Sequence, residues 1–196
     1  EQVRFTVSQT VKEAVYFSMG EDWPQSRAQL EHLLQQRERF DVVAIGPGLG
    51  RWAGDKDWLR EWMTLSQPLV LDADALNMLA DEVGMLGKRN GITVLTPHPG
   101  EMARLLHVSV KEVEADRDQA ALTLAVKYGV YVVLKGRYTV VATPDGQCWL
   151  NTSGSPGMAK AGSGDVLTGI ITGLLAQPAI ETRQAILSAV YIHGLA

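Results

Sequence analysis

The chain has 196 residues, 46% of them hydrophobic and 20% charged, which suits a globular protein with a sizeable core. The net charge of −4 and the scattered lysines and arginines argue against a basic nucleic-acid or membrane surface. The single cysteine, Cys148, excludes an intrachain disulfide; no Cys/His cluster has zinc-ligand spacing, and no apolar run reaches membrane-spanning length. We therefore expect one domain over residues 1–196, located in the cytoplasm, without nucleic-acid or membrane partners.

The first half of the chain alternates short apolar runs with amphipathic stretches. Trp58, Leu59, Trp62 and Met63 form one stripe at helical spacing, which indicates a face that packs on the core rather than an aromatic binding site. The run at residues 40–45 is short and apolar, as in a buried strand. In chain order we expect a strand at 3–7, a helix at 26–39, strands at 40–45 and 68–72, a glycine-rich break at 46–50 and a helix at 55–65.

The second half continues this alternation. Two apolar runs on either side of Pro144, Asp145 and Gly146 predict a β-hairpin, and Pro178 ends a later helix. We expect a helix from residue 75, a strand at 91–95, a helix after 100, a helix at 117–128, a strand at 130–134, the hairpin at 139–150, and helices from 165 and at 181–193. This order predicts an α/β fold, a mainly parallel sheet with helices on both faces, plus a small β-hairpin.

Chemically distinctive residues follow four successive expected strands. In open α/β sheets, ligands bind beyond the carboxyl ends of the strands, so these residues are expected to gather at one edge. Their convergence is a stronger indication of a site than any single member. They are the glycines of 46–50, the pair Asp72 and Asp74, His98, and Lys135 with Gly136.

Each of these features also has a second interpretation. The run at 46–50 is not G-x-G-x-x-G and fits a plain tight turn equally well. Asp72 and Asp74 could hold Mg²⁺ with substrate phosphates or cap the next helix, and capping is favoured for Asp74. Prolines on both sides of His98 make a rigid turn, which favours a binding role. Lys135 alone is uninformative, and structural roles are assigned to His32, His107 and His193.

A glycine-rich stretch at 151–165 leads into an apolar, helical run. Four glycines within eleven residues let the backbone approach a ligand closely, and a helix N-terminus there would present free N–H groups. Such a point suits a phosphate. Asp165 at this place is either a general base on a reacting hydroxyl or only the N-cap of the helix, and the spacing leaves both open.

Taken together, these segments resemble the ADP/ATP-dependent NAD(P)H-hydrate dehydratases, which have the ribokinase-like fold and repair hydrated nicotinamide nucleotides. The resemblance covers roughly residues 40–196. It implies that the hydroxyl of the hydrate (NADHX or NADPHX) is phosphorylated and phosphate is then eliminated, which makes the protein a hydro-lyase. The donor is ADP in bacterial members and ATP in eukaryotic ones, with Mg²⁺ expected, and a homo-oligomer is expected as well. The matching segments are 46–50, 71–77, 96–101, 134–136 and 151–165.

The same resemblance implies a role for each matching residue. Asp165 would be the base on the substrate hydroxyl, and Gly162, Ser163 and Gly164 would hold the transferred phosphoryl group. The hydrate-binding residues would be Gly48, Gly50, His98 and Asp165. The nucleotide-binding residues would be Lys135, Gly136, Arg137, Tyr138, Thr139, Gly157, Met158, Gly162, Ser163 and Gly164.

The sequence departs from the family pattern in three places. An upstream strand–helix unit with a glycine-rich motif is not found, and family members continue into further helix after Ala196, so we expect a fragment of the full domain. Arg137 and Tyr138 are bulkier than the small residues expected there; Arg137 either contacts phosphate or points to solvent. Because Gly162 to Asp165 fits many ribokinase-like proteins, a vitamin-precursor kinase remains an alternative. The expected truncation leaves a non-catalytic nucleotide-binding module as another.

Overall fold

Six short strands form one sheet in the computed structural model, which describes residue 11 and residues 27–196. The strands follow one another across the sheet in sequence order; the first four are parallel, and the last two run antiparallel to their neighbours. The strand expected at residues 3–7 lies outside the described residues. The strands are β1 (Val43–Ile45), β2 (Leu69–Leu71), β3 (Thr93–Leu95), β4 (Tyr131–Leu134), β5 (Val140–Ala142) and β6 (Cys148–Leu150).

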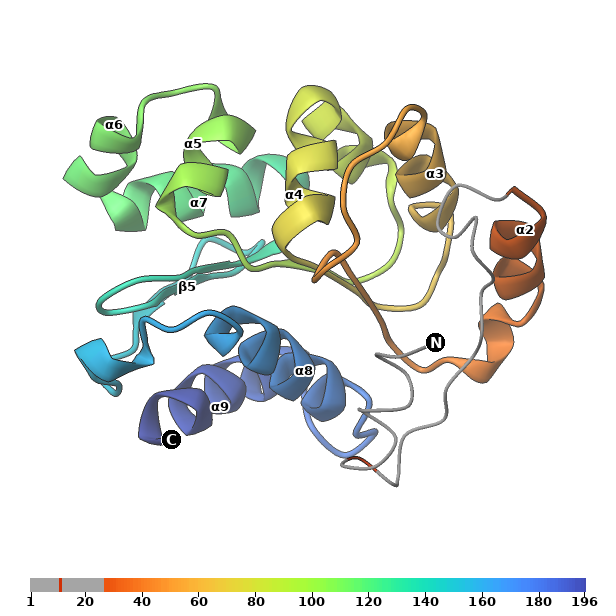
Figure 1. Ribbon diagram of the computed structural model, residues 1–196. Helices are drawn as coiled ribbons and strands as arrows, with labels where there is room; N and C mark the ends of the chain where they lie inside the picture. Colours follow the sequence, from red (N-terminus) through yellow and green to blue (C-terminus); the bar gives the residue numbers. More distant parts are fainter. Residues whose placement is uncertain (1–10, 12–26) are drawn as a thin grey trace.

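Helices cover both faces of this sheet (Figure 1). Parallel strands that advance in one direction through right-handed crossovers place all of their connecting helices on the same face. The last two helices come after the hairpin and cover the opposite face. The α-helices are α2 (Arg27–Gln35), α3 (Asp55–Trp62), α4 (Ala73–Leu79), α5 (Pro99–Leu106), α6 (Val110–Ala115), α7 (Arg117–Tyr128), α8 (Ser163–Leu175) and α9 (Thr182–Leu195), and the 3₁₀ helices are η1 (Arg37–Arg39), η2 (Ala80–Lys88) and η3 (Pro156–Met158).

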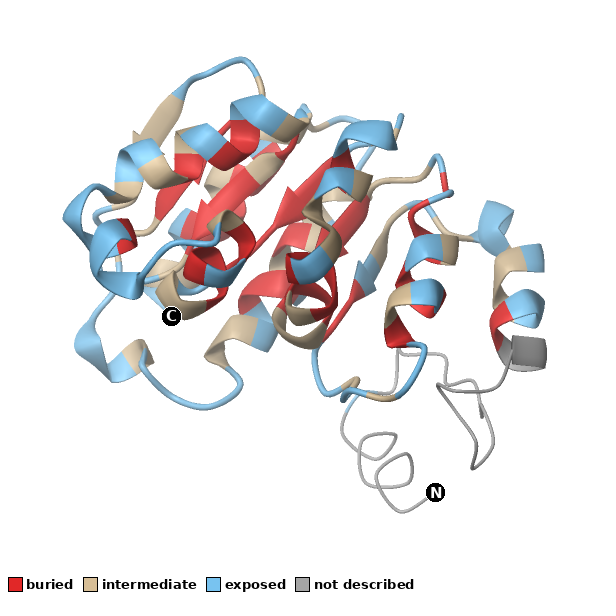
Figure 2. Ribbon diagram, turned by 90° about the horizontal axis from the view of Figure 1, so that it is seen from above, coloured by how far each residue is buried: buried red, intermediate tan, exposed pale blue. Residues whose placement is uncertain are grey.

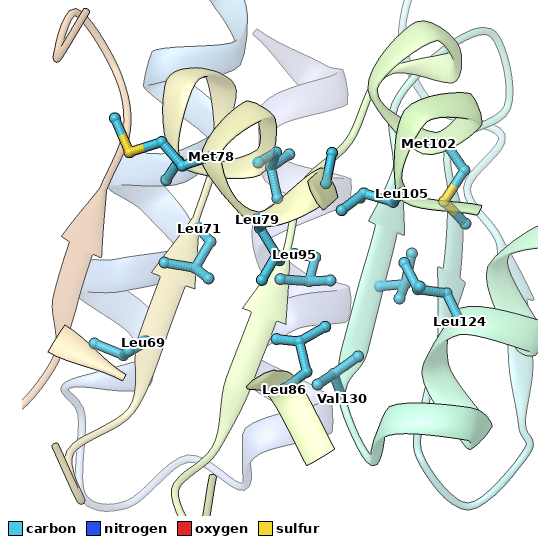
Figure 3. Close-up of a cluster of buried hydrophobic side chains, with 14 of the residues drawn as sticks. Leu69, Leu71, Met78, Leu79, Leu86, Leu95, Met102, Leu105, Leu124 and Val130 are labelled. Atoms are coloured by element: carbon cyan, nitrogen blue, oxygen red, sulfur yellow. The ribbon is translucent and has the colours of Figure 1, made fainter. Parts of the chain in front are cut away.

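The core has two layers, one on each face of the sheet. Side chains of successive strand residues point to opposite faces, so Leu69 and Leu71 pack under α4 and its neighbours, while Val70 packs against α8 and α9. Figure 3 shows the first layer, in which Leu95 lies beneath Leu79. The strands read as continuous apolar runs because both of their faces are buried.

The predicted α/β class with helices on both faces is confirmed. The predicted hairpin is present as β5 and β6, and because β5 also pairs with β4 it extends the sheet. The strand predicted at 40–45 is present but shorter, since β1 spans only Val43–Ile45. It is less buried than expected, with Val43 half-buried and Ala44 exposed. Among the described strands β1 is an edge with β2 as its one neighbour, and Figure 2 shows the buried residues concentrated in the inner strands.

The helices differ from expectation mainly at their ends. The helix expected at 26–39 ends at Gln35 and is followed by η1, and the one expected at 55–65 ends at Trp62. The side chains of its predicted core stripe are at most 7% exposed, as expected: Trp58, Leu59, Trp62 and Met63. None of the described helices has the length and hydropathy needed to cross a membrane.

Gly46 gives a direct test of how tightly the β1 turn packs. Its φ is +130°, and a Cβ at this position would overlap the carbonyl oxygen of Asp72. We expect Gly46→Ala to lower the free energy of unfolding by about 3 kcal/mol, because both the backbone and the neighbouring carbonyl must shift. The measurement is chemical denaturation.

The matched control is Gly173→Ala in α8, where an added Cβ meets nothing within 4 Å. Alanine there should stabilise the helix by about 0.5–1 kcal/mol. Similar unfolding midpoints for the two variants would contradict the tight packing of Gly46 on the β2–α4 connection.

Candidate active site

The N-terminus of α8 opens at the carboxyl ends of the parallel strands. Its N-cap residue is Gly162, with a φ of 87°, and no side chain caps the helix. Among the described residues, no acceptor pairs with the N–H groups of Gly164 and Asp165. Free N–H groups and the positive end of the helix dipole favour an anion at this point.

Asp165 lies in the first turn of α8 and its side chain is exposed. The alternative in which Asp165 is the N-cap is wrong, because Gly162 occupies that position. The carboxylate therefore has no capping bond to make and remains available to a bound molecule. It stands beside a pocket of about 450 Å³ whose other walls include Gly46, Pro47 and Thr168.

Beneath this helix start lies a buried carboxylate that joins three elements. Lys135, which follows β4, donates a hydrogen bond from Nζ to Asp72 Oδ1 at 2.6 Å. The hydroxyl of Thr168 in α8 donates to Asp72 Oδ2 at 2.7 Å. Asp72 is 1% exposed and Thr168 2%. The lysine is therefore held at the end of the sheet, against the first turn of α8.

The two aspartates that follow β2 do not act as the sequence suggested. Asp72 sits at the N-cap position of α4 but makes no side-chain cap, because both of its oxygens accept from Lys135 and Thr168. The capping role favoured for Asp74 is also wrong. Asp74 lies inside the first turn of α4 and accepts a hydrogen bond from the backbone N–H of Gly50 at 2.8 Å. It thereby anchors the glycine-rich loop after β1.

His98 caps α5. Its Nδ1 accepts from the N–H groups of Gly100 at 3.0 Å and Glu101 at 3.3 Å, while Glu101 Oε2 accepts from the His98 N–H at 2.8 Å. In the neutral ring the proton therefore belongs on Nε2, which lies 3.4 Å from Glu101 Oε1. The His98 side chain is 51% exposed. Its rigid setting was expected, whereas its capping role was not.

Hydrogen bonds from neighbouring elements hold the start of the loop at 135–139. The Lys135 N–H donates to the Pro97 carbonyl at 2.8 Å, and the Arg117 guanidinium donates to the carbonyls of Leu134 and Lys135 at 3.1 and 3.2 Å. A Cβ on Gly136 would lie 2.5 Å from Arg117 Nη1, so this contact requires glycine there. Arg117 was not among the residues that the sequence singled out.

The outer part of the same loop is exposed. The guanidinium of Arg137 lies over the ring of Tyr138, 5.0 Å from its centroid, and both side chains face solvent. Tyr138 has a φ of +57°, and the Thr139 hydroxyl donates to the Gly136 carbonyl at 3.2 Å. The Arg137 side chain therefore reaches into solvent, where it is free to meet a bound phosphate.

The glycine-rich stretch is tied to the last helix. The Ser153 hydroxyl contacts Asn151 Oδ1 at 2.9 Å and the carbonyl of Tyr191 at 3.2 Å. His193 Nε2 lies 2.9 Å from the carbonyl oxygen of Ser163, and because a carbonyl only accepts, this nitrogen carries the proton. The sequence predicts a structural role for His193. No local sequence pattern could have predicted its contact with Ser163, which lies 30 positions away.

The structure thus gathers most of the predicted site residues at one edge of the sheet. Asp165, Ser163 and Gly164 form the start of α8, Lys135 lies below it, and Gly48 and Gly50 belong to the exposed loop beside the pocket. Gly157 is exposed and Met158 half-buried in η3, ahead of α8. Trp58 and Trp62 serve the core and also line the pocket next to Asp165.

This sheet order and helix-start site define a ribokinase-like α/β protein, and the comparisons with known proteins agree. Over 86% of this chain and 58% of the other, the structure superposes on a ribokinase-like superfamily protein from Enterococcus faecalis, with a TM-score of 0.70 and 33% identity. The ADP/ATP-dependent NAD(P)H-hydrate dehydratase of Bacillus subtilis, co-crystallised with ATP/Mg²⁺, gives a TM-score of 0.76 at 34% identity, over 99% of this chain and 65% of that one.

Residues 2–196 match the sequence model of NAD(P)H-hydrate dehydratase, and the chain belongs to this family. It is 48% identical over 172 residues to the bifunctional NAD(P)H-hydrate repair enzyme Nnr of Moorella thermoacetica. That alignment includes 87% of this chain and 32% of the relative, so the chain spans about a third of the length of this relative.

The capping role of His98 can be measured by itself. His98→Ala removes the side-chain acceptor for two N–H groups of α5, and we expect a loss of about 1 kcal/mol in the free energy of unfolding. His98→Asn keeps a capping oxygen and should retain most of that stability. Denaturation curves check both variants. Equal stability of His98→Ala and the unmodified protein would show that the cap contributes nothing.

Proposed function

We propose that this protein dehydrates hydrated NADH or NADPH, with ADP or ATP as phosphoryl donor and Asp165 as the general base. The observation that carries the proposal is the meeting, at one point, of the uncapped start of α8, the ammonium of Lys135 and the exposed carboxylate of Asp165. This combination suits phosphoryl transfer, because positioning and charge stabilisation supply most of its catalysis.

Each group has a defined task in the proposed reaction. Asp165 accepts the proton of the hydrate hydroxyl as that oxygen attacks the terminal phosphorus of the nucleotide. The N–H groups of Gly164 and Asp165, with Lys135, stabilise the negative charge on the transferred phosphoryl group. The bond to the nucleotide breaks, which releases AMP when ADP is the donor. Loss of phosphate and of a ring proton from the phosphorylated hydrate then restores the nicotinamide.

We infer that the two substrates bind at different places around the start of α8. We assign the hydrate to the pocket beside Asp165, next to the loop with Gly48 and Gly50. The family resemblance adds His98 to the residues that bind it. The nucleotide phosphates are assigned to the loop at 135–139 and to the stretch with Gly157 and Met158. The Bacillus subtilis dehydratase, a structural relative that was co-crystallised with ATP/Mg²⁺, supports the use of a nucleotide.

Magnesium fits this site as a companion of the nucleotide rather than as a resident ion. Among the described residues, no three His, Cys, Asp or Glu side chains gather into a metal-binding group. Asp72 and Asp74 are already engaged by hydrogen-bond donors, which leaves Asp165 as the exposed carboxylate beside the phosphate position. Mg²⁺ retains several waters and takes one or two carboxylates with phosphate oxygens, and it would neutralise phosphate charge here.

A ribokinase-like small-molecule kinase is the second candidate, because the same helix start and carboxylate could transfer phosphate to another alcohol. The two functions differ in the step after phosphoryl transfer. A dehydratase releases inorganic phosphate and reduced nicotinamide, whereas a kinase accumulates the phosphorylated alcohol. Incubation with hydrated NADH and ADP or ATP, and then measurement of reduced nicotinamide and free phosphate, separates them; failure to recover NADH would rule out the dehydratase.

The role of Asp165 can be tested with Asp165→Asn in the full protein. We expect kcat to fall by roughly 10²–10⁴, the range for loss of a general base, while nucleotide affinity changes little. Asp118→Asn is the matched control, because Asp118 is an exposed carboxylate in the first turn of α7. It loses a comparable interaction with the helix dipole and should keep full activity. Unchanged turnover in Asp165→Asn would refute the assignment of the base.

A further inference from the structure

Asp72 is a buried carboxylate whose two oxygens are both taken by residues of the candidate active site. Oδ1 accepts from Lys135 at 2.6 Å and Oδ2 accepts from Thr168 at 2.7 Å. With 1% exposure, Asp72 has no access to a substrate. Its contacts all lead to the lysine and to the helix that form the phosphate position.

The place of Lys135 needs explanation, because a helix N-terminus is electrostatically unfavourable for a cation. Its Nζ lies 3.3 Å from the position that a Cβ on Gly164 would occupy, so the ammonium touches the first turn of α8. Only 20% of the side chain is exposed. The carboxylate of Asp72 offsets the repulsion and keeps the lysine from turning away toward solvent.

A second acidic residue completes the setting of the lysine. Glu101 Oε2 lies 4.0 Å from Lys135 Nζ, and the same oxygen accepts from the N–H of His98. The ammonium therefore has one hydrogen bond to Asp72 and a longer ion pair to Glu101, and it lies beside Gly164. A phosphate at the free N–H groups of α8 would be within reach of this lysine.

We propose that Asp72 and Thr168 are positioning residues that fix Lys135 for recognition of the terminal phosphate of a nucleoside di- or triphosphate. The inference rests on the proposed function and adds to it two residues that do not touch the reacting atoms. Thr168 orients the carboxylate from α8, and the carboxylate orients the ammonium from β2. The lysine then makes a charge-assisted bond to a phosphate that AMP lacks.

The variant that tests this with least disturbance is Thr168→Val, which removes one hydroxyl and keeps the side-chain shape. Thr168→Ser retains the hydroxyl and is the control. Affinities of the full protein for ADP and AMP are measured by titration calorimetry, with kcat and the unfolding temperature recorded in parallel. We expect Thr168→Val to weaken the preference for ADP over AMP about tenfold, with AMP affinity unchanged, and to lower kcat. Thr168→Ser should restore both.

Asp72→Asn should reduce the preference for ADP and kcat more than Thr168→Val does. A double substitution tests whether Thr168 acts through Lys135. Lys135→Met alone should remove the preference for ADP, and Thr168→Val added to it should cause no further loss, because the threonine acts through the lysine. If Asp72→Asn does not fold, the Thr168 and Lys135 variants still test whether the lysine is positioned in this way.

Three results would overturn the inference. One is an unchanged ADP preference and kcat in Thr168→Val. Regeneration of NADH by the unmodified enzyme would then still support the proposed function. Another is an equal weakening of ADP and AMP binding together with a lower unfolding temperature, the mark of a purely structural role. The third is an unmodified protein that neither prefers ADP to AMP nor regenerates NADH, and that result removes the proposed function as well.

Discussion

The partly buried ion pair between Asp72 and Lys135 is the interaction on which the candidate site depends. The two residues are 63 positions apart, and Thr168, 96 positions from Asp72, completes the group. A buried charge that loses its partner is strongly destabilising, so this pairing fixes the ends of β2 and β4 and the start of α8 relative to one another. The same contacts that secure the fold therefore set the distance between a cation and the free N–H groups of the helix.

The topology of the sheet explains why α8 is the element that reaches this point. Strands β1 to β4 advance in one direction, so their connecting helices occupy one face and leave the other open. The hairpin of β5 and β6 extends the sheet, and the chain after it returns along the open face. Leu167 and Ile171 of α8 pack on that face, which holds its first turn over the strand ends.

Several residues near the site stabilise the fold and also contact the groups that are proposed to bind the substrates. His98 begins α5 through a reciprocal cap with Glu101, and Glu101 in turn lies beside Lys135. Asp74 holds the loop of Gly50 next to the pocket that Asp165 enters. Polar contacts thus run from His98 through Glu101, Lys135 and Asp72 to Thr168 of α8, and a separate contact holds the loop of Gly50. Substitutions at these contacts are expected to affect both stability and binding, so each needs a variant that separates the two.

The sequence by itself determined the features that depend on neighbours along the chain. The periodicity at 117–128, the turn residues of the hairpin and the glycines ahead of α8 were sufficient, because helix faces and turns are set within a few residues. Only the tertiary structure decided the partners of Asp72, Asp74 and His193, each bonded to a residue 24 or more positions away. Local propensity favours capping for both aspartates, but Asp72 is buried and pairs with the charge of Lys135, while Asp74 accepts from the backbone N–H of Gly50.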